Sequence, residues 1–480
     1  MNVRREKNKK GEKVRDRGVA AGYVVAAIVV IVVIIAAAVV VTLPRGPTAP
    51  TGAPTSIKFG HTGPYTGVLA TAESICKTFY DLWTEQANAQ GGLYLSEYDT
   101  RVPVSWVFYN DMGDTGKAST NVEKLITEDR VDIIYGSYGT FQGFAQHELV
   151  NNLAAQDYKT IYMVGNGTCV LWDTAEEFYS YYWENKVYKD SQGRPWYTWE
   201  YTLWTEMPRA FHMEALVDVL EEVGVQSVVV WKIGTLYGIE SQRFLEYLLE
   251  NTNISILDVK EYPMDITDFT ALITSARALN PDAIIQFSYP SDGMKSIEDM
   301  ISLNYNPKLF YNALGVTSGD AYTKFGKKLD GIMYHSTAFP KSPMSRGMFG
   351  TGMDVLHAYV EKYGFAPDVI DGAIAYATVE VMGTLIERAG SLDKDAIYQE
   401  VLKSKDNPIP TVIGPVYWER GPWPELPGVV GQHIGTTDNS LGEDCEIVGA
   451  AFGERVGITR TWNKSQWVTH APVYPKPAWS

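Results

Sequence analysis

The stretch that decides the fold is Ser227-Val228-Val229-Val230-Trp231, a strand-length run that is apolar along almost its whole length. A helical pattern over 240–250 follows it, and a second apolar run covers 254–259. A strand that is apolar on both sides must be buried on both faces, which is typical of a parallel sheet covered by helices. The order strand, helix, strand therefore predicts a right-handed βαβ crossover.

Strand and helix patterns alternate in the same way through most of residues 56–405. The expected strands are 57–60, 102–108, 131–135, 160–164, 227–231, 254–259, 283–287 and 309–311. The expected helices are 116–128, 141–156, 210–223, 240–250, 269–279 and 296–303, with one more around Ile75, Phe79, Leu82 and Trp83. The cycle stops after 164 and restarts near 210, which predicts two α/β lobes. In the Pro/Gly/Trp-rich end of the chain, short strands are expected at 412–418 and 456–462.

The composition excludes several classes of protein. With 45% hydrophobic and 20% charged residues, a chain of 480 residues can bury real cores and is not a disordered protein. Its formal net charge is −16, so it repels phosphate backbones, and we expect no nucleic-acid partner. Three cysteines permit at most one internal disulfide, so the fold does not depend on a cysteine framework.

An uncharged apolar run near the N-terminus predicts a membrane anchor. The run covers Val19 to Leu43 and follows a basic head at 1–18. At about 1.5 Å per residue it is longer than the roughly 30 Å hydrocarbon core of a bilayer. The basic head should stay in the cytoplasm, which places the bulk of the chain outside the cell. Residues 44–55, rich in Pro, Gly and Thr, then read as a linker.

Two kinds of processing remain as alternatives to an intact anchor. Ala36-Ala37-Ala38 could serve as a signal-peptidase site, which would release the body. Arg17-Gly18 resembles a prepilin-type cleavage site, which would remove the basic head and keep the helix. We favour a retained anchor because Val39–Leu43 prolong the apolar run beyond a usual signal peptide.

Signatures of common enzyme and metal sites are missing from the sequence. It has no P-loop, no His-Glu-x-x-His, no Gly-x-Ser-x-Gly and no paired Cys-x-x-Cys, and its seven histidines are scattered. We therefore expect no catalytic residue, no cofactor and no metal ligand.

Residues 57–67, Ile-Lys-Phe-Gly-His-Thr-Gly-Pro-Tyr-Thr-Gly, resemble the opening of the leucine/isoleucine/valine-binding protein family. These are the type I solute-binding proteins of ABC importers. Further matches follow in order at Asn88–Gly92, Tyr109–Asp111, Asp132–Gly136, Leu236–Gly238, Asp268–Leu272 and Asn280–Ala283. The resemblance covers about residues 56–405. It implies a two-lobed α/β fold, the type I periplasmic-binding-protein fold, whose hinge crossovers let two parallel-sheet lobes close on a small ligand.

The pattern and the resemblance together give domain limits. Lobe 1 is expected at 56–204 plus about 336–405. Lobe 2 is expected at 205–335 plus about 406–480, the last part being a C-terminal extension.

The resemblance also implies candidate ligand-binding residues. Those on lobe 1 are Tyr65, Gly139, Thr140, Gly167 and Thr168. Those on lobe 2 are Tyr237 and Tyr289, with Ser288 as the neighbour of the latter. Each has a plainer reading: Thr140 as a helix N-cap, Gly167 and Thr168 as a turn, and Tyr237 as packing at the edge of a lobe.

One departure from the family bears on the ligand. The amino-acid binders place an acidic residue after a late strand of the second lobe, where it pairs with the ligand ammonium, but residues 310–315 here read Phe-Tyr-Asn-Ala-Leu-Gly. A buried ammonium without a counter-charge costs several kcal/mol. Either Asp292 or Asp320 replaces that acid, or the ligand is not a free α-amino acid. We favour the second alternative, an organic acid, an amide or an aromatic compound.

The sequence therefore predicts a membrane-anchored binding protein on an archaeal or Gram-positive-like cell surface. It would capture a small molecule and deliver it to the permease of an ABC importer. A ligand-sensing receptor domain that acts through a membrane partner is the alternative, and an extracellular enzyme ranks third. The densely aromatic segment at 172–200 is either an insertion packed on a lobe or a lid over the cleft.

Overall fold

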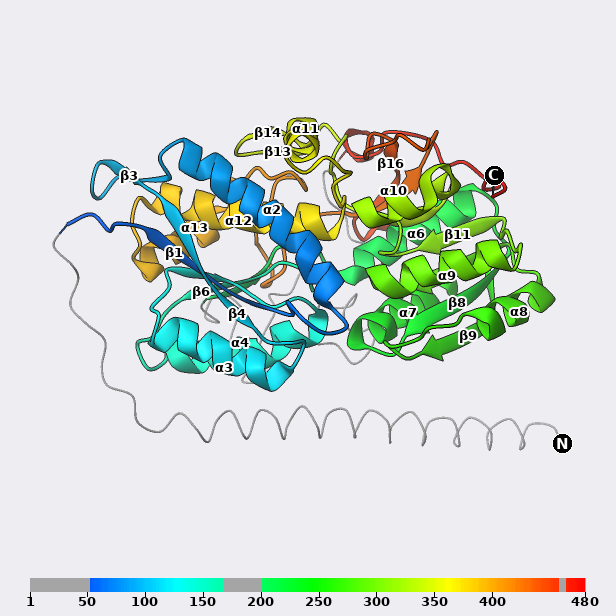
Figure 1. Ribbon diagram of the computed structural model, residues 1–480, viewed down its shortest axis with the longest axis horizontal. Helices are drawn as coiled ribbons and strands as arrows, with labels where there is room; N and C mark the ends of the chain where they lie inside the picture. Colours follow the sequence, from blue (N-terminus) through cyan, green and yellow to red (C-terminus); the bar gives the residue numbers. More distant parts are fainter. Residues whose placement is uncertain (1–51, 168–200, 457–462, 480) are drawn as a thin grey trace.

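Two sheets, each at the centre of one α/β lobe, organise the chain (Figure 1). The structure is a computed structural model that describes residues 52–167, 201–456 and 463–479. The predicted anchor at 19–43, the aromatic segment at 172–200 and nearly all of the predicted strand at 456–462 lie outside these residues. Within the described ranges, no helix has both the length and the apolar character needed to cross a bilayer.

The first sheet is parallel throughout, as predicted. Its strands, in spatial order, are β4 (Val104–Asn110), β1 (Ile57–Gly63), β5 (Ile133–Tyr135), β6 (Ile161–Val164) and β7 (Thr202–Trp204). Every residue of β5, β6 and β7 is buried, because helices cover both faces. Helices α2 (Ala70–Ala89), α12 (Asp371–Ala389) and α13 (Lys394–Lys403) lie on one side, and α3 (Thr115–Thr127) and α4 (Thr140–Ala154) on the other (Figure 1).

The second sheet has a parallel body and an antiparallel edge. Its strands, in spatial order, are β16 (Cys445–Ala451), β15 (Gly428–His433), β12 (Met333–Ser336), β11 (Leu309–Asn312), β10 (Ala283–Phe287), β8 (Ser227–Ile233) and β9 (Ser255–Tyr262). β15 runs antiparallel to both of its neighbours. The expectation of an all-parallel sheet is therefore wrong at this edge, where β15 and β16 follow each other without the helical crossover that parallel strands need.

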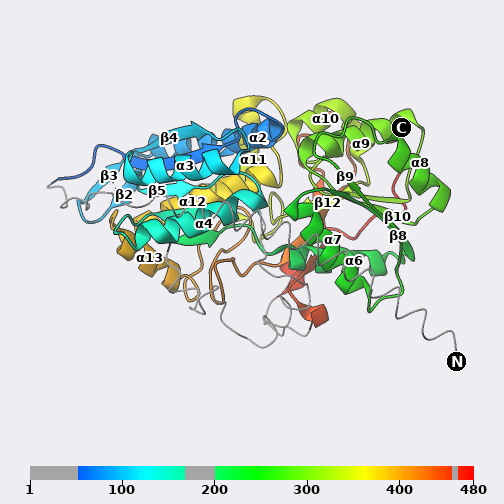
Figure 2. The same ribbon diagram turned by 90° about the horizontal axis from the view of Figure 1, so that it is seen from below.

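Helices cover both faces of the second sheet (Figure 2). They are α6 (Arg209–Glu222) and α7 (Leu236–Leu249) on one face, with α8 (Thr270–Leu279), α9 (Pro290–Ser302) and α10 (Gly319–Phe325) on the other. Two of them begin earlier than predicted. Thr235 caps α7 by accepting a hydrogen bond from the Gly238 amide at 3.5 Å. In α9, Pro290 holds the first position, and Asp292 accepts from the Tyr289 amide at 2.9 Å.

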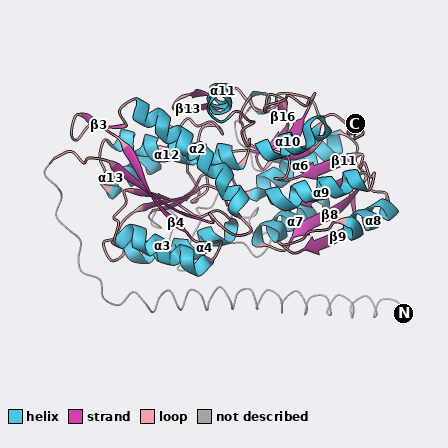
Figure 3. Cartoon of the chain, in the orientation of Figure 1, coloured by secondary structure: helices cyan, strands magenta, loops and turns pink. Residues whose placement is uncertain are grey.

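Smaller elements complete the described chain (Figure 3). They are the hairpins β2 (Leu93–Leu95) with β3 (Thr100–Val102) and β13 (Arg346–Gly347) with β14 (Gly350–Thr351), helix α11 (Gly352–Tyr363), and the 3₁₀ turns Gly326–Leu329, Glu454–Val456 and Lys464–Gln466. The strand predicted at 412–418 is wrong. Pro410, Gly414 and Pro415 interrupt pairing there, and only one bridge forms, between Ile409 and Val416.

The chain passes between the two lobes three times. It leaves the first sheet after β7, returns after β12, and crosses again between α13 and β15. The lobes also touch directly, through α4 against α7 and α2 against α9. The two sheets are thus joined by several segments around a shared gap, and the residue limits of the lobes stay a prediction.

Gly428 lets α6 lie directly against β15. A Cβ atom at this position would come within 2.0 Å of the Phe211 carbonyl carbon and 2.1 Å of the His212 amide nitrogen. Because these are backbone atoms, neither can turn aside.

We expect Gly428→Ala to lower the free energy of unfolding by about 3 kcal/mol, measured by urea titration. Gly116→Ala in α3, whose nearest neighbour is the Asp114 side chain at 3.3 Å, is the control and should change stability by no more than about 1 kcal/mol. Equal effects of the two substitutions would contradict the close packing.

Candidate functional site

A narrow cleft lies between the two lobes, with an envelope of about 290 Å³ that includes the solvent at its mouth. Lobe 1 and the adjoining start of α12 contribute Tyr138, Gly139, Thr140, Asn166, Gly167 and Asp371, and lobe 2 contributes Glu206, Arg209, Tyr237, Tyr289, Leu314 and His335. The side chains among them are buried, and the cleft keeps a mouth that opens to solvent. Such a recessed, partly aromatic space with a few charged groups is typical of a small-molecule site.

On lobe 1, the cleft is formed by two turns that follow neighbouring strands. The first turn, after β5, leads into α4 through Gly139, whose φ of 106° favours glycine. The second turn, after β6, carries Asn166 and Gly167. The Gly139 amide donates to the Asn166 carbonyl at 2.8 Å, which fastens the turns together. A side chain at Gly167 would come within 3.2 Å of the Thr140 amide nitrogen, so glycine here keeps the start of α4 accessible.

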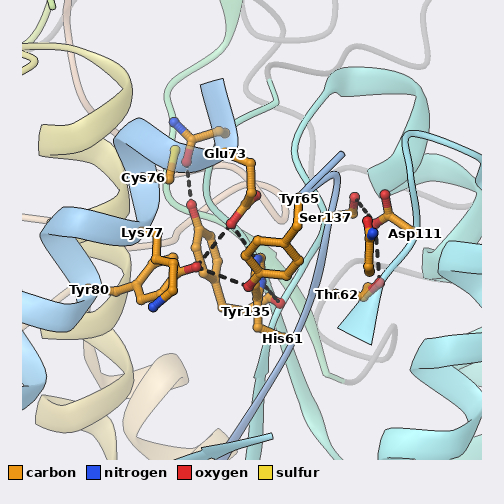
Figure 4. Close-up of polar contacts among 12 residues, drawn as sticks. His61, Thr62, Tyr65, Glu73, Cys76, Lys77, Tyr80, Asp111, Tyr135 and Ser137 are labelled. Carbon is orange, nitrogen blue, oxygen red and sulfur yellow. Dashed lines mark hydrogen bonds and ion pairs between the residues drawn. The ribbon is translucent and has the colours of Figure 1, made fainter. Parts of the chain in front are cut away.

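A buried carboxylate supports the first of these turns from behind (Figure 4). Asp111, just after β4, accepts hydrogen bonds from Ser137 at 2.6 Å and from Thr62 at 3.1 Å. Ser137 directly precedes Tyr138, the first cleft residue of the turn. Asp111 thereby connects β1 and β4 to the turn that forms this wall of the cleft.

On lobe 2, the charged centre of the cleft is Arg209, the first residue of α6. Its guanidinium donates to Glu206 at 3.2 Å and to His335 Nδ1 at 2.9 Å. It also lies over the ring of Tyr237, 4.8 Å from the centroid. A cation held between a carboxylate, an imidazole and an aromatic face is oriented as well as buried.

Aromatic rings continue from Arg209 across the gap between the lobes. Tyr237 stacks on Tyr289 with centroids 5.5 Å apart, and Tyr289 meets Tyr138 of lobe 1 edge to face at 6.1 Å. The buried hydroxyl of Tyr237 has no hydrogen-bond partner among the described residues. An unsatisfied buried hydroxyl beside a cleft is suited to a polar atom of a bound molecule.

Five helices begin at the cleft: α4 at Thr140, α6 at Arg209, α7 next to Tyr237, α9 after Tyr289 and α12 at Asp371. Helix N-termini carry a partial positive charge and so favour anionic groups, although Thr235, Asp292 and Asp368 already accept from amides at the starts of α7, α9 and α12. Together with Arg209, they make the cleft suitable for a carboxylate.

Two buried acids face these positive ends. Burial raises the pKa of Glu206 to about 7, although Arg209 and the Gly167 amide, 3.1 Å away, act in the opposite direction. Burial and the nearby charge of Asp368 raise the pKa of Asp371 well above its usual value. Asp371 accepts from Tyr138 at 2.8 Å and from Asn166 at 3.2 Å. The cleft therefore holds carboxyl groups that are poised to be protonated or to meet a cation.

A chain of hydrogen bonds joins two buried histidines behind Arg209 and fixes the tautomer of the first, His335. Because a guanidinium only donates, His335 Nδ1 must accept, so the proton of this neutral ring sits on Nε2. That proton is donated to His212 Nε2 at 2.9 Å, and His212 Nδ1 lies 3.2 Å from both the carbonyl oxygen and the amide nitrogen of Val429. Burial lowers the pKa of both histidines well below the usual value, as this neutral arrangement requires. The cleft is thus linked to β15.

A second pocket between the lobes holds two of the sequence candidates. It measures about 890 Å³ up to its mouth and is lined by residues of α2, α10 and α11, with Tyr65, Asp320 and Asp368. Beneath it, the Tyr65 hydroxyl lies 3.1 Å from that of Tyr80, which donates to Glu73 at 3.0 Å (Figure 4). Tyr65 and Asp320 therefore lie apart from the residues that surround Arg209.

The structure brings together five of the predicted site residues: Gly139, Thr140, Gly167, Tyr237 and Tyr289. Ser288 is buried next to them but faces Asn312, 3.2 Å away, and does not line the cleft. Asp292 is occupied at the start of α9, where it also accepts from Tyr262 at 2.6 Å. Thr168 lies outside the described residues.

Sequence reasoning missed the charged residues of the cleft. Arg209 could have been noticed in the sequence, because the helix dipole disfavours a cation at the first position of a helix, and such a residue often has a functional role. Asp371 opens α12, which follows the second passage of the chain between the lobes, far from the strands where an acid was expected. Glu206 follows the three-residue strand β7, which is too short to show a periodic pattern.

The model of a family described as periplasmic binding protein matches residues 56–421. The chain belongs to this family. Its fold is that of the type I binding proteins, which confirms the resemblance seen in the sequence. A leucine-binding protein from Thermotoga maritima superposes with a TM-score of 0.61 at 17% identity, covering 82% of this chain and 98% of that one.

Two further solved binding proteins have the same fold. One is the branched-chain amino acid transporter substrate-binding protein of Streptococcus pneumoniae in complex with isoleucine, with a TM-score of 0.63 at 16% identity, covering 82% of this chain and 99% of that one. The other is an ABC transporter solute-binding protein of R. palustris in complex with benzoate, with a TM-score of 0.64 at 14% identity, covering 83% and 96%.

The raised pKa of Asp371 predicts how the stability of this binding protein depends on pH. Above about pH 4 an unfolded Asp releases its proton, whereas folded Asp371 keeps it. The free energy of unfolding should therefore fall as pH rises from 4 to 7, by up to about 1.4 kcal/mol per pH unit from this group. Asp371→Asn removes the effect, so the variant should gain stability relative to the unmodified protein over that range.

Denaturant titrations at several pH values measure this difference. Asp268→Asn is a control of opposite sign, because hydrogen bonds from Thr270 lower the pKa of the exposed Asp268. A difference between Asp371→Asn and the unmodified protein that stays constant from pH 4 to 7 would show that Asp371 titrates normally.

Proposed function

We propose that this chain is the solute-binding protein of an ABC importer and that the cleft around Arg209 binds the solute. The observation that carries this proposal is the cleft where five helices begin and where Arg209, two carboxyl groups and three tyrosines converge. A family of solute-binding proteins needs no reaction, and we propose binding without catalysis.

The contacts of the cleft suggest how a ligand would be held. Arg209 and the first amides of α4 would bind a carboxylate, as helix N-termini and guanidinium groups commonly do. Tyr138, Tyr237 and Tyr289 offer ring faces for an apolar or aromatic body. The free hydroxyl of Tyr237 would take one further hydrogen bond.

The acids of the cleft widen the range of ligands that we consider. Without a usable acid, the sequence favoured an organic acid, an amide or an aromatic compound over an amino acid. Asp371 and Glu206 now offer counter-charges for an ammonium from other elements. The two relatives described above were solved with isoleucine and with benzoate, and both are classes of ligand that the present cleft could hold. We therefore propose a small carboxylic acid, with or without an amino group.

Binding would require movement of the lobes. The tyrosines and Arg209 already occupy much of the gap, so a ligand enters only if the lobes part or these side chains turn. Three crossing segments are suited to a hinge, because each can absorb a small backbone rotation. Closure would then bring Tyr138 of lobe 1 against Tyr289 of lobe 2, as in the present arrangement.

A thermal-shift screen of amino acids, amides and aromatic acids, without refolding of the protein, tests the proposal. We expect at least one of these compounds to raise the melting temperature. Tyr237→Phe should then weaken its binding by about fivefold, because one hydrogen bond is worth about 1 kcal/mol. Calorimetric titration measures the affinity.

Tyr376→Phe is the matched control, since it removes the hydroxyl of a fully buried tyrosine on α12 outside the cleft lining. It should leave the affinity unchanged. If Tyr237→Phe and Thr140→Ala both bind the identified compound as tightly as the unmodified protein, the ligand does not sit in this cleft.

We also propose that residues 19–43 anchor the protein in the cell membrane, with the lobes outside the cell. The length of the uncharged run and the basic head before it support this. A tether keeps the binder near its permease and raises its local concentration.

The anchor predicts that the protein stays with the membrane fraction of its native cells. Intact mass spectrometry should give either the whole chain or a chain cut after Gly18, and deletion of 19–43 should move the protein to the soluble fraction. A mature N-terminus just after Ala38 would contradict the anchor.

A further inference from the structure

Three side chains with metal-binding atoms meet at the antiparallel edge of the second sheet. His433 ends β15 and lies opposite Cys445, the first residue of β16, and Asp444 directly precedes that cysteine. All three are buried. One ligand atom of each lies within 4.8 Å of the others. This place is separate from the cleft around Arg209.

The imidazole of His433 is oriented as in many metal sites. Its Nε2 donates to the Val316 carbonyl at 2.9 Å, which fixes the ring. Its Nδ1 faces Asp444 Oδ2 at 2.8 Å and Cys445 Sγ at 3.9 Å. A histidine that gives one ring N–H to a backbone carbonyl presents the other nitrogen to a metal in the correct tautomer.

The carboxylate and the thiol have outer partners as well. The Tyr322 hydroxyl donates to Asp444 Oδ1 at 2.8 Å and lies 3.2 Å from Cys445 Sγ. Thr436 donates to Asp444 Oδ2 at 2.5 Å. Such outer hydrogen bonds hold the side chains of metal ligands in place, so these side chains need little further ordering when an ion binds.

We propose that His433 Nδ1, Asp444 and Cys445 Sγ bind one Zn²⁺ ion. A nitrogen, a carboxylate oxygen and a thiolate sulfur form a set that zinc prefers, with a fourth position left for the Tyr322 hydroxyl or a water. Hard cations such as Ca²⁺ and Mg²⁺ select oxygen ligands and do not match it.

The balance of charge permits this ion inside the protein. The two positive charges of Zn²⁺ would meet one carboxylate and one thiolate beside a neutral imidazole, so the occupied site would carry no net charge.

The ion would hold the C-terminal strands to lobe 2. Its ligands come from β15 and β16, whereas Val316 and Tyr322 belong to the loop after β11 and to α10. β15 pairs with β12, the strand that carries His335 of the cleft. This site could not be predicted from the sequence, because His433 comes next to Asp444 and Cys445 only when β15 and β16 pair.

The test uses the full chain without a histidine tag, stripped of metal by a chelator and then titrated with zinc chloride alone. We expect one tightly held zinc per chain by elemental analysis and a rise in melting temperature. Cys445→Ser should weaken zinc binding by more than the roughly 100-fold that loss of an outer partner costs. Thr436→Ala, a milder change, should weaken it by about 10- to 100-fold.

Cys76→Ser is the matched control, because it removes another buried thiol, near Asp371 on lobe 1. It should keep the zinc. In the cobalt-loaded protein, the thiolate-to-metal absorption should be present for Cys76→Ser and absent for Cys445→Ser.

Two outcomes would overturn the proposal. If the folded protein retains no zinc, His433 and Asp444 form an ion pair only. If Cys445→Ser and Thr436→Ala both retain zinc as tightly as the unmodified protein, the ion sits elsewhere, for example on the buried group Glu206, His212 and His335.

Discussion

Parallel strands within a lobe share one direction, and this constraint places the starts of α4, α7 and α9 at the cleft. In each sheet, the carboxyl ends of the parallel strands lie at the same edge, and the next helix begins there. The two edges face each other, so that α4 and α12 begin opposite α6, α7 and α9. The cleft is therefore a consequence of strand direction, and the side chains at these helix starts give it its chemistry.

Charge inside the cleft is balanced without a ligand. Arg209 is paired with Glu206, and Asp371 carries a raised pKa because burial and Asp368 oppose its ionisation. A ligand that brings a carboxylate can use Arg209 and the helix amides, and one that also brings an ammonium can use the acids. The hydrogen-bonded histidines His335 and His212 keep the guanidinium directed into the cleft, so its orientation depends on β12 and β15 as well as on α6.

Most of the fold could be predicted because buried parallel strands have a simple signature. The apolar run at 227–231 and its counterparts mark strands that the structure contains, with ends that shift by a few residues. The antiparallel edge of the second sheet was not predicted, because strand β15 contains two glycines and a polar end rather than an apolar run.

The cleft was predictable only in part. Thr140, Tyr237 and Gly167 follow strands and carry recognisable local motifs. Arg209, Glu206 and Asp371 reach the cleft through the crossings between lobes, and the position of a crossing depends on tertiary structure. Spacing along the chain cannot show that residues 206 and 371 become neighbours.

The pairing of β15 with β12 also determines where an independently folding piece of this protein can end. The family match stops at residue 421, before β15 begins, yet the last described residues still bond to lobe 2: the Trp479 indole donates to the Tyr305 carbonyl at 2.8 Å, and the Lys476 amide to the Lys308 carbonyl at 2.7 Å. A fragment cut at the family boundary would expose the backbone of β12 as an open edge, a known route to aggregation. The autonomous unit therefore extends to the tail, well beyond what homology alone would delimit.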